Sequence, residues 1–152
     1  KDEAAVREAF SAIMQATKKA PEAKILGVLI QKFLPVGNEF IVGGTQDASF
    51  GQLIMTGLGG IYTALFRDTS FRLSPTTIEE IYEMLSELKA WKLLLGMRGK
   101  AQSDIEALAN IVLSVSFLLQ ECPQISELDL NPVLVSEKGV MVVDAKVVVD
   151  EK

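Results

Sequence analysis

The sequence predicts an α+β fold in which helices pack on one side of a mainly antiparallel sheet. The first observation is a series of apolar, often β-branched runs that short polar turns separate. The second is a set of longer segments with apolar residues at three- and four-residue spacing, the pattern of amphipathic helices. We expect six strands, near residues 25–34, 39–46, 52–58, 62–72, 125–135 and 140–149.

The first three expected strands are joined by short turns and should form an antiparallel meander. The run 25–34 has little polar alternation, which is typical of a strand buried on both faces. Three helices are expected, over residues 2–20, 76–89 and 103–121. Thr76 with Glu79, and Ser103 with Glu106, have the spacing of capping boxes at the starts of the second and third helices.

Length and composition indicate a single folded domain spanning residues 1–152. A chain of this length buries roughly 70% of its unfolded surface. Hydrophobic residues make up 49% of the sequence, and the mean hydropathy is +0.28. The net charge of −5 argues against a nucleic-acid partner, since such binding needs a basic surface. No apolar run reaches the ~18 residues of a membrane span, so no membrane partner is expected.

The single cysteine, Cys122, excludes an internal disulfide and fits a reducing compartment, so we expect a cytoplasmic protein. The absence of histidine removes histidine-based acid–base and metal chemistry. The sequence begins with Lys1-Asp2-Glu3, already at the start of a helix, and shows no signal peptide. This abrupt start indicates a fragment or a truncated chain.

The most informative stretch is the predicted hairpin over residues 125–149. If Glu137-Lys138 form a two-residue turn, residues that face each other have numbers that sum to 275, and Asn131 faces Asp144. Alternation along the strand then places Glu127, Asp129 and Asn131 on one face, with Asp144 opposite and Lys146 nearby. Pro132 holds Asn131 extended and removes a ladder donor. A simple three-residue turn would break this arrangement.

Such a group of carboxylate and amide oxygens suits Mg²⁺, a hard cation that also keeps waters and substrate phosphates as ligands. Mn²⁺ is the alternative cation, because no thiolate or imidazole is available for a softer metal. The other interpretation is a solvated face of a hairpin, on which polar residues alternate without any function.

A family resemblance appears in the same stretch. Glu127-Leu-Asp-Leu-Asn-Pro132, followed by Asp144 in Val-Asp-Ala-Lys, resembles the metal-binding strand pair of ATP-grasp enzymes. More narrowly, it resembles the β subunit of the NDP-forming acyl-CoA synthetases, which include succinyl-CoA synthetase and ADP-forming acetyl-CoA synthetase. The resemblance implies that Asn131 and Asp144 hold the Mg²⁺ of the nucleotide. It also implies that Asp129 lies beside the metal, where an arriving phosphohistidine would react.

A second part of the resemblance lies upstream, in Ile30-Gln-Lys-Phe-Leu34 and Glu39-Phe-Ile-Val-Gly43. These segments look like the adenine hinge and the ribose-binding glutamate of the family, which implies nucleotide contacts at Gln31, Lys32, Leu34 and Glu39. Gln31 and Lys32 depart from the glutamates common at these positions in relatives. Without the resemblance, Glu39 has an equally good interpretation as a solvated strand end.

The cluster Gly57-Leu-Gly-Gly60 has two interpretations, a tight turn or a backbone cradle for phosphate. The longer run from Phe50 to Pro75 resembles the ADP-forming subfamily closely. Within that run, Arg67 and Arg72 could neutralise phosphate or lie on the surface, and Arg98 further on has no assigned role.

The resemblance covers residues 4–149 and implies the C-terminal portion of an ATP-grasp domain, whose N-terminal part is absent from this chain. Relatives interconvert acyl-CoA, ADP and phosphate with the free acid, CoA and ATP, through an acyl phosphate and a phosphohistidine. The expected partners are ATP or ADP and the CoA-ligase α subunit or domain that carries the phosphohistidine. The alternative is a non-catalytic, regulatory ATP-grasp-like module of a protein acetyltransferase. The sequence does not identify the acyl group.

Overall fold

The computed structural model of the chain describes residues 2–34, 37–60, 68–97, 99 and 101–150. The chain divides into two compact units, residues 1–35 and residues 36–152. Helix α1 (Glu3–Thr17) lies in the first unit, and Asp2 caps it by accepting the Ala5 N–H at 3.0 Å. The predicted first helix is therefore confirmed. None of its residues is buried.

The predicted strand at 25–34 is wrong, because residues 24–34 form neither helix nor strand. Large apolar side chains in this segment are exposed, with Leu26 at 87% and Ile30 at 85%. The apolar run alone suggested a doubly buried strand. A strand, however, requires a neighbour that pairs with its backbone groups, and an apolar composition does not show whether such a neighbour is present.

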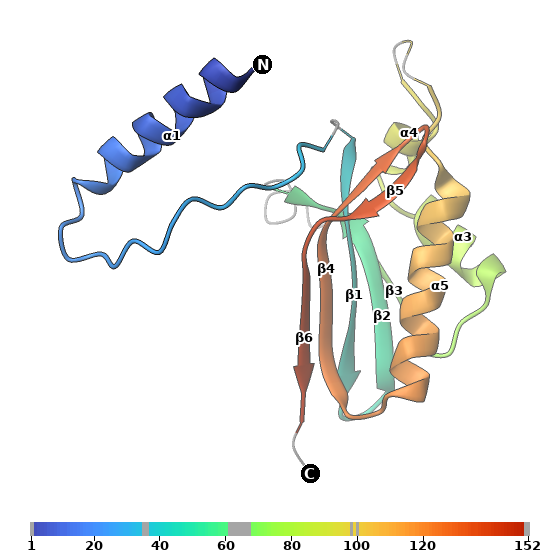
Figure 1. The fold of residues 1–152 in the computed structure, drawn as a ribbon. Coiled ribbons are helices and arrows are strands. Elements are labelled where there is room, and N and C mark those ends of the chain that lie inside the picture. The colour runs from blue at the N-terminus through green and yellow to red at the C-terminus, as the bar shows by residue number, and fades with distance from the viewer. Residues whose placement is uncertain (1, 35–36, 61–67, 98, 100, 151–152) are drawn as a thin grey trace. The chain divides into compact units, whose positions relative to one another are not determined.

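The second unit is built on a six-stranded sheet (Figure 1). The strands are β1 (Asn38–Asp47), β2 (Gly51–Leu58), β3 (Thr69–Leu73), β4 (Ile125–Ser136), β5 (Gly139–Val142) and β6 (Ala145–Val149). Their order is β3-β2-β1-β4-β5, β6 also pairs with β4, and every pairing is antiparallel. The meander therefore consists of β1, β2 and β3, one strand later in the chain than predicted. The predicted strand at 62–72 is found only from Thr69, and residues 61–67 lie outside the described part.

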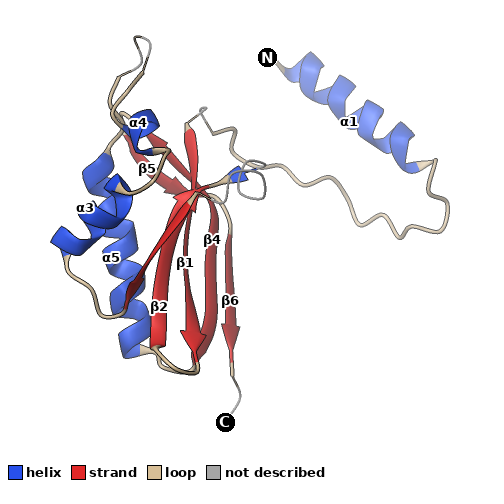
Figure 2. Cartoon of the chain, turned by 180° about the vertical axis from the view of Figure 1, so that it is seen from behind, coloured by secondary structure: helices blue, strands red, loops and turns tan. Residues whose placement is uncertain are grey.

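The described part of this unit also contains the helices α3 (Ile78–Ser86), α4 (Trp91–Leu94) and α5 (Ile105–Glu121). Figures 1 and 2, from opposite sides, show α3 and α5 along the same side of the sheet. The fully buried side chains between the two layers include Phe40 and Val42 of β1, Ile54 of β2 and Leu108 of α5. The predicted α+β fold, an antiparallel sheet with helices on one side, is thus confirmed.

Both predicted helix caps are displaced by one residue. Thr77, not Thr76, caps α3, and it forms a capping box with Glu80 instead of Glu79. Asp104, not Ser103, caps α5 by accepting the Ala107 N–H at 2.9 Å. Ser103 instead accepts a hydrogen bond from the amide of Asn38, 3.1 Å away. No helix in the described part of the chain combines the length and apolar character that crossing a membrane requires.

The C-terminal hairpin has the predicted register. The pairs Val135–Val140 in the β4–β5 ladder and Asp129–Lys146 in the β4–β6 ladder both have numbers that sum to 275. The predicted strand at 140–149 is nevertheless divided, because the ladder stops at residues 143 and 144. Strands β5 and β6 are therefore two parts of one return strand.

Strand β4 contains a bulge at Asn131-Pro132, which simple alternation did not predict. Opposite it, Phe40 pairs with Val133 and Val42 with Leu130, so one residue of β1 faces two of β4. The side chains facing the core shift accordingly, from Leu128 and Leu130 before the bulge to Val133 and Val135 after it. Strict alternation holds for Glu127 and Asp129 and ends at the bulge. The side-chain direction of Asn131 therefore stays a prediction.

Candidate functional site

Polar side chains gather on the sheet face that the helices leave uncovered. Leu128 is buried in the core, so its neighbours Glu127 and Asp129 point to the other face of β4. Lys146 pairs directly with Asp129 across the β4–β6 ladder, which places both side chains on the same face. Lys146 Nζ lies 3.2 Å from Glu127 Oε1. The predicted grouping of these three residues is therefore found.

Asp129 is the unusual member of this group. Its Oδ1 atom is buried, and no hydrogen-bond donor in the described part of the chain reaches it. Burial raises the pKa of its carboxyl group above 3.8, and the negative charges of Glu127 and Asp144 raise the pKa further. Lys146 opposes this shift. A buried carboxylate oxygen without a donor suits a cation, or a substrate group that brings its own proton.

The charge of Asp129 should therefore cost stability when no cation is bound. Because the folded pKa is raised, this cost is absent below pH 3.8 and appears as the pH rises through the folded pKa. We expect Asp129→Asn to raise the thermal unfolding temperature at neutral pH without Mg²⁺, and to lose this advantage in acid. Thermal unfolding at a series of pH values tests this, with Asp150→Asn at an exposed position as the control. A variant less stable than the parent at neutral pH would contradict the prediction.

A hollow of about 260 Å³ lies beside Asp129 on the open face. The side chains that form it are mostly apolar and come from β1, β2, β3 and β4: Ile41, Thr45, Leu53, Met55, Phe71, Glu127 and Asp129. Gly43 lies within it, and a side chain there would meet the main chain of Leu128. The half-buried carboxylate of Asp129 thus opens onto a largely apolar recess.

Asn131 and Asp144 lie opposite each other at the interruption of the hairpin. The Asn131 N–H donates to the main-chain oxygen of Asp144 at 3.1 Å, and the Val143 N–H donates to Pro132 O at 3.0 Å. The Asp144 carboxylate is exposed, and its Oδ1 accepts the Ala145 N–H at 2.9 Å. The negative charge of Asp144 helps to raise the pKa of the Asp129 carboxyl group.

The described residues contain no cluster of three or more histidine, cysteine, aspartate or glutamate side chains that could hold a metal by themselves. An amide from Asn131 and a carboxylate from Asp144 would supply two oxygens. Mg²⁺ commonly takes one or two protein carboxylates and completes its shell with waters and substrate phosphates. The oxygen chemistry of these residues, with the unpartnered oxygen of Asp129 nearby, fits such a cation. The metal assignment stays a prediction.

Glu39 lies at the start of β1 with an exposed side chain, beside the glycine cluster. Gly59 donates its N–H to Glu39 O at 2.8 Å, and Gly60 has a positive φ of 67°. A Cβ atom on Gly60 would overlap Glu39 Oε2. The glycines therefore permit a close approach between the end of β2 and the start of β1. The sequence did not reveal this close approach, and the two interpretations of the cluster, a tight turn and a phosphate cradle, stay predictions.

The remaining candidates have different outcomes. Gln31, Lys32 and Leu34 belong to the first unit, in the segment without regular structure, and their nucleotide contacts stay a prediction. Arg72 forms an ion pair with Glu87, 2.6 Å away, which raises the pKa of the Arg72 guanidinium. Its charge therefore has a partner within the chain. Arg67 and Arg98 lie outside the described residues.

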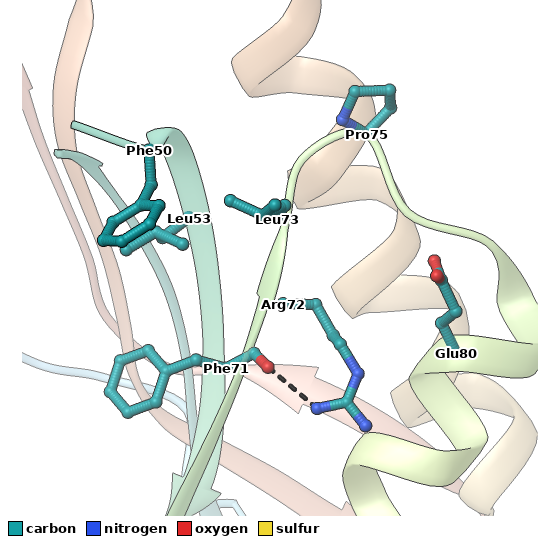
Figure 3. A pocket seen from close by; sticks show the side chains of 7 residues that line it. All are labelled: Phe50, Leu53, Phe71, Arg72, Leu73, Pro75 and Glu80. Carbon is teal, nitrogen blue, oxygen red and sulfur yellow. Dashed lines mark hydrogen bonds between the residues drawn. The ribbon is translucent and has the colours of Figure 1, made fainter. Parts of the chain in front are cut away.

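A second hollow, of about 620 Å³, lies at the sheet edge formed by β3 (Figure 3). Its two charged side chains are already engaged, Arg72 with Glu87 and Glu80 in the capping box of α3. In Figure 3, Arg72 points to the side of α3 and Phe71 to the opposite side of the strand. We assign no chemistry to this hollow.

The antiparallel sheet with one covered face and an acidic open face has clear structural relatives. An acetyl-CoA synthetase of Ca. Korarchaeum cryptofilum, solved with coenzyme A and Mg-AMPPCP, matches 99% of the chain with a TM-score of 0.82 and 38% identity. The chain covers 65% of that structure's chain. In that synthetase a phosphohistidine segment points towards the nucleotide binding site. The chain is therefore similar in fold to a domain of a synthetase that was solved with a nucleotide analogue.

Residues 1–149 match the family model described as "ATP-grasp domain", and the chain belongs to this family. It is 44% identical over 149 residues to the β subunit of an ADP-forming acetate–CoA ligase of Pyrococcus furiosus. It is 42% identical over 139 residues to an ADP-forming 4-hydroxybutyrate–CoA ligase of Nitrosopumilus maritimus. The two matches include 97% and 91% of this chain. They include only 64% of the length of the Pyrococcus protein and 20% of the length of the Nitrosopumilus protein. The resemblance stated from the sequence is confirmed.

Proposed function

We propose that this chain is the nucleotide-binding ATP-grasp part of an ADP-forming acyl-CoA synthetase. The complete enzyme would interconvert acyl-CoA, ADP and phosphate with the free acid, CoA and ATP. The observation that carries the proposal is the 44% identity, over 97% of the chain, to a subunit of an ADP-forming acetate–CoA ligase. The chain is about equally identical to relatives named for acetate and for 4-hydroxybutyrate, at 44% and 42%. We therefore propose an acyl-CoA synthetase without naming one acid.

Within this function, Asn131 and Asp144 would hold Mg²⁺, with Mn²⁺ as a substitute. The bound cation would neutralise phosphate oxygens and fix their geometry. The two residues come from opposite sides of the interrupted hairpin, where Asn131 N–H binds Asp144 O. This hydrogen bond keeps the two backbones in register. Support for a cation comes from the charge balance, since three carboxylates face one lysine.

Asp129 would act beside the phosphates as the catalytic carboxylate. Its buried, unpartnered oxygen could accept a proton or hydrogen bond from an arriving imidazole that carries the phosphoryl group. Lys146 and Glu127 neutralise each other at 3.2 Å, which leaves the charge of Asp129 available to the substrate. Gln31, Lys32 and Leu34 would form the adenine hinge, with contacts largely through main-chain atoms.

The partners of the chain follow from the same assignment. We infer that the phosphohistidine and the CoA site belong to a CoA-ligase subunit or domain outside these residues. The chain would be one portion of a single ATP-grasp domain and would not turn over alone. A cytoplasmic location fits the single cysteine, which is free.

The decisive experiment is an assay of the complete protein with its CoA-ligase subunit or domain. Acetyl-CoA, ADP, phosphate and Mg²⁺ are supplied, and ATP and free CoA are measured. We expect ATP and free CoA to appear in equal amounts and to require all four components. The assay is repeated with 4-hydroxybutyryl-CoA in place of acetyl-CoA. A protein that binds nucleotide but forms no ATP from either acyl-CoA would be a non-catalytic regulatory module instead. Absence of nucleotide binding would contradict the proposal altogether.

Glu39→Ala tests the nucleotide contact directly. We expect ADP binding by the complete protein to weaken by ~1–3 kcal/mol, as for the loss of a charged hydrogen-bond partner. Isothermal titration calorimetry in the presence of Mg²⁺ measures the effect. Glu137→Ala, in the exposed turn between β4 and β5, is the matched control and should bind as the parent does. Equal affinities for parent and Glu39→Ala would remove Glu39 from the site.

A further inference from the structure

The glycine cluster brings the end of β2 against the first residues of β1. The regular ladder ends where Phe40 pairs with Leu58. Beyond it, the Gly59 N–H still donates to Glu39 O at 2.8 Å. A Cβ atom on Gly59 would lie 2.8 Å from the main-chain oxygen of Phe40, closer than real Cβ atoms come. Gly59 therefore fixes the two chain segments in contact.

Gly60 acts on a side chain instead of on the backbone. Its φ of 67° is in the left-handed region, which glycine adopts without strain. A Cβ atom there would overlap Oε2 of Glu39 and would lie 3.1 Å from its Cδ. The Glu39 carboxylate thus occupies the space that any side chain at position 60 would need. Glu39 is exposed, so its side chain can adopt another rotamer, and an added methyl group would displace the carboxylate more readily than the backbone.

We propose that Gly60 is a positioning residue that sets the direction of the Glu39 carboxylate for hydrogen bonding to the ribose hydroxyls of a nucleotide. This inference rests on the proposed function, and it adds a determinant of ribose recognition that touches no substrate. A carboxylate held in one orientation can accept from two neighbouring hydroxyls at once. A carboxylate that swings freely must lose this freedom on binding, which weakens the complex.

The test compares Gly60→Ala with Gly51→Ala in the complete protein. Gly51 also has a positive φ, 81°, but a Cβ atom there would meet nothing within 4 Å. Gly51→Ala therefore carries the backbone strain without the contact to Glu39. Calorimetry with ADP and Mg²⁺ should show about tenfold weaker binding for Gly60→Ala, as for a lost charged hydrogen bond. Gly51→Ala should bind within about twofold of the parent, the scatter expected for a site without such a contact.

Two further readouts separate positioning from general damage. In a Glu39→Ala background, Gly60→Ala should cause no additional loss, because the carboxylate that it displaces is gone. The parent should bind ADP more tightly than 2′-deoxy-ADP, and Gly60→Ala should reduce this preference towards unity. If Gly60→Ala does not fold, Glu39→Asp provides a second test, because it keeps the negative charge but is one methylene shorter and so moves the carboxylate away from its contact with Gly60. Loss of the ribose preference in Glu39→Asp supports the inference, and an unchanged preference overturns it.

The outcomes also distinguish this inference from the proposed function. If Glu39→Ala weakens ADP binding but Gly60→Ala binds as Gly51→Ala does, the positioning role is overturned and the ribose contact stands. If Glu39→Ala binds ADP as the parent does, the ribose assignment is overturned and the positioning role with it. ATP formation by the parent protein remains a separate measurement, which tests the synthetase activity itself.

Discussion

Asp144→Asn is expected to lower turnover of the complete enzyme about a hundredfold or more, since a metal supplies several kcal/mol of transition-state stabilisation. Unfolding stability should change by less than ~0.5 kcal/mol, as for other exposed positions. The Asp144 side chain is exposed, and the hydrogen bond that it accepts from the Ala145 N–H can be kept by the asparagine amide oxygen. The substitution therefore removes a charge while it preserves the local structure.

Steady-state ATP formation at several Mg²⁺ concentrations measures this effect, and thermal unfolding measures stability. Asp47→Asn is the matched control. The Asp47 carboxylate, at the C-terminal end of β1, also accepts hydrogen bonds from main-chain N–H groups, those of Ser49 and Phe50. Asp47→Asn should retain parental turnover. Equal turnover for Asp144→Asn and its parent would remove Asp144 from the metal site. A loss of turnover matched by a loss of stability would assign Asp144 a structural role.

Phe40→Ala is expected to destabilise the fold by about 3–5 kcal/mol, the usual cost of truncating a buried phenylalanine. Phe40 is fully buried in the core at the centre of the sheet. Removing its ring would leave a cavity that the neighbouring strands cannot close. Most single domains are stable by only ~5–15 kcal/mol, so this loss is a large part of the total.

Urea unfolding followed by the fluorescence of Trp91, the single tryptophan of the chain, measures this loss. Phe117→Ala on α5 is the control, because its side chain is 54% exposed and should contribute under ~0.5 kcal/mol. Similar losses for the two variants would show that the core does not form around Phe40.

The sequence predicted the elements whose pattern depends on local contacts. The pairing in which facing residue numbers sum to 275 followed from a two-residue turn at Glu137-Lys138. The β4–β5 ladder obeys it, and so does the β4–β6 ladder from Glu127 to Leu130. The grouping of Glu127, Asp129 and Lys146 followed from strand alternation. The segment 25–34 failed, because apolar composition does not reveal whether a pairing partner is present. Its prediction depended on a non-local contact.

The bulge at Asn131-Pro132 did leave a signal that was missed. Apolar residues fall at 128 and 130 before it and at 133 and 135 after it, so the alternation changes parity within one strand. Such a change is the mark of one extra residue in a strand that keeps the same buried face. The contact of Gly60 with Glu39 left no such signal, since residues 39 and 60 meet only through the pairing of β1 with β2.

The bulge also has a consequence for how this stretch tolerates insertions and deletions. Each half of β4 is fixed by its own partner, residues 125–130 by β6 and residues 133–136 by β5. Losing one residue at the bulge would force one half to rotate, turning Leu128 and Leu130, or Val133 and Val135, out of the core. An alignment gap of one residue is therefore not tolerated at residues 131–132. The spacing between Asp129 and the hairpin turn is thus set by the packing of the core as well as by the chemistry of the open face.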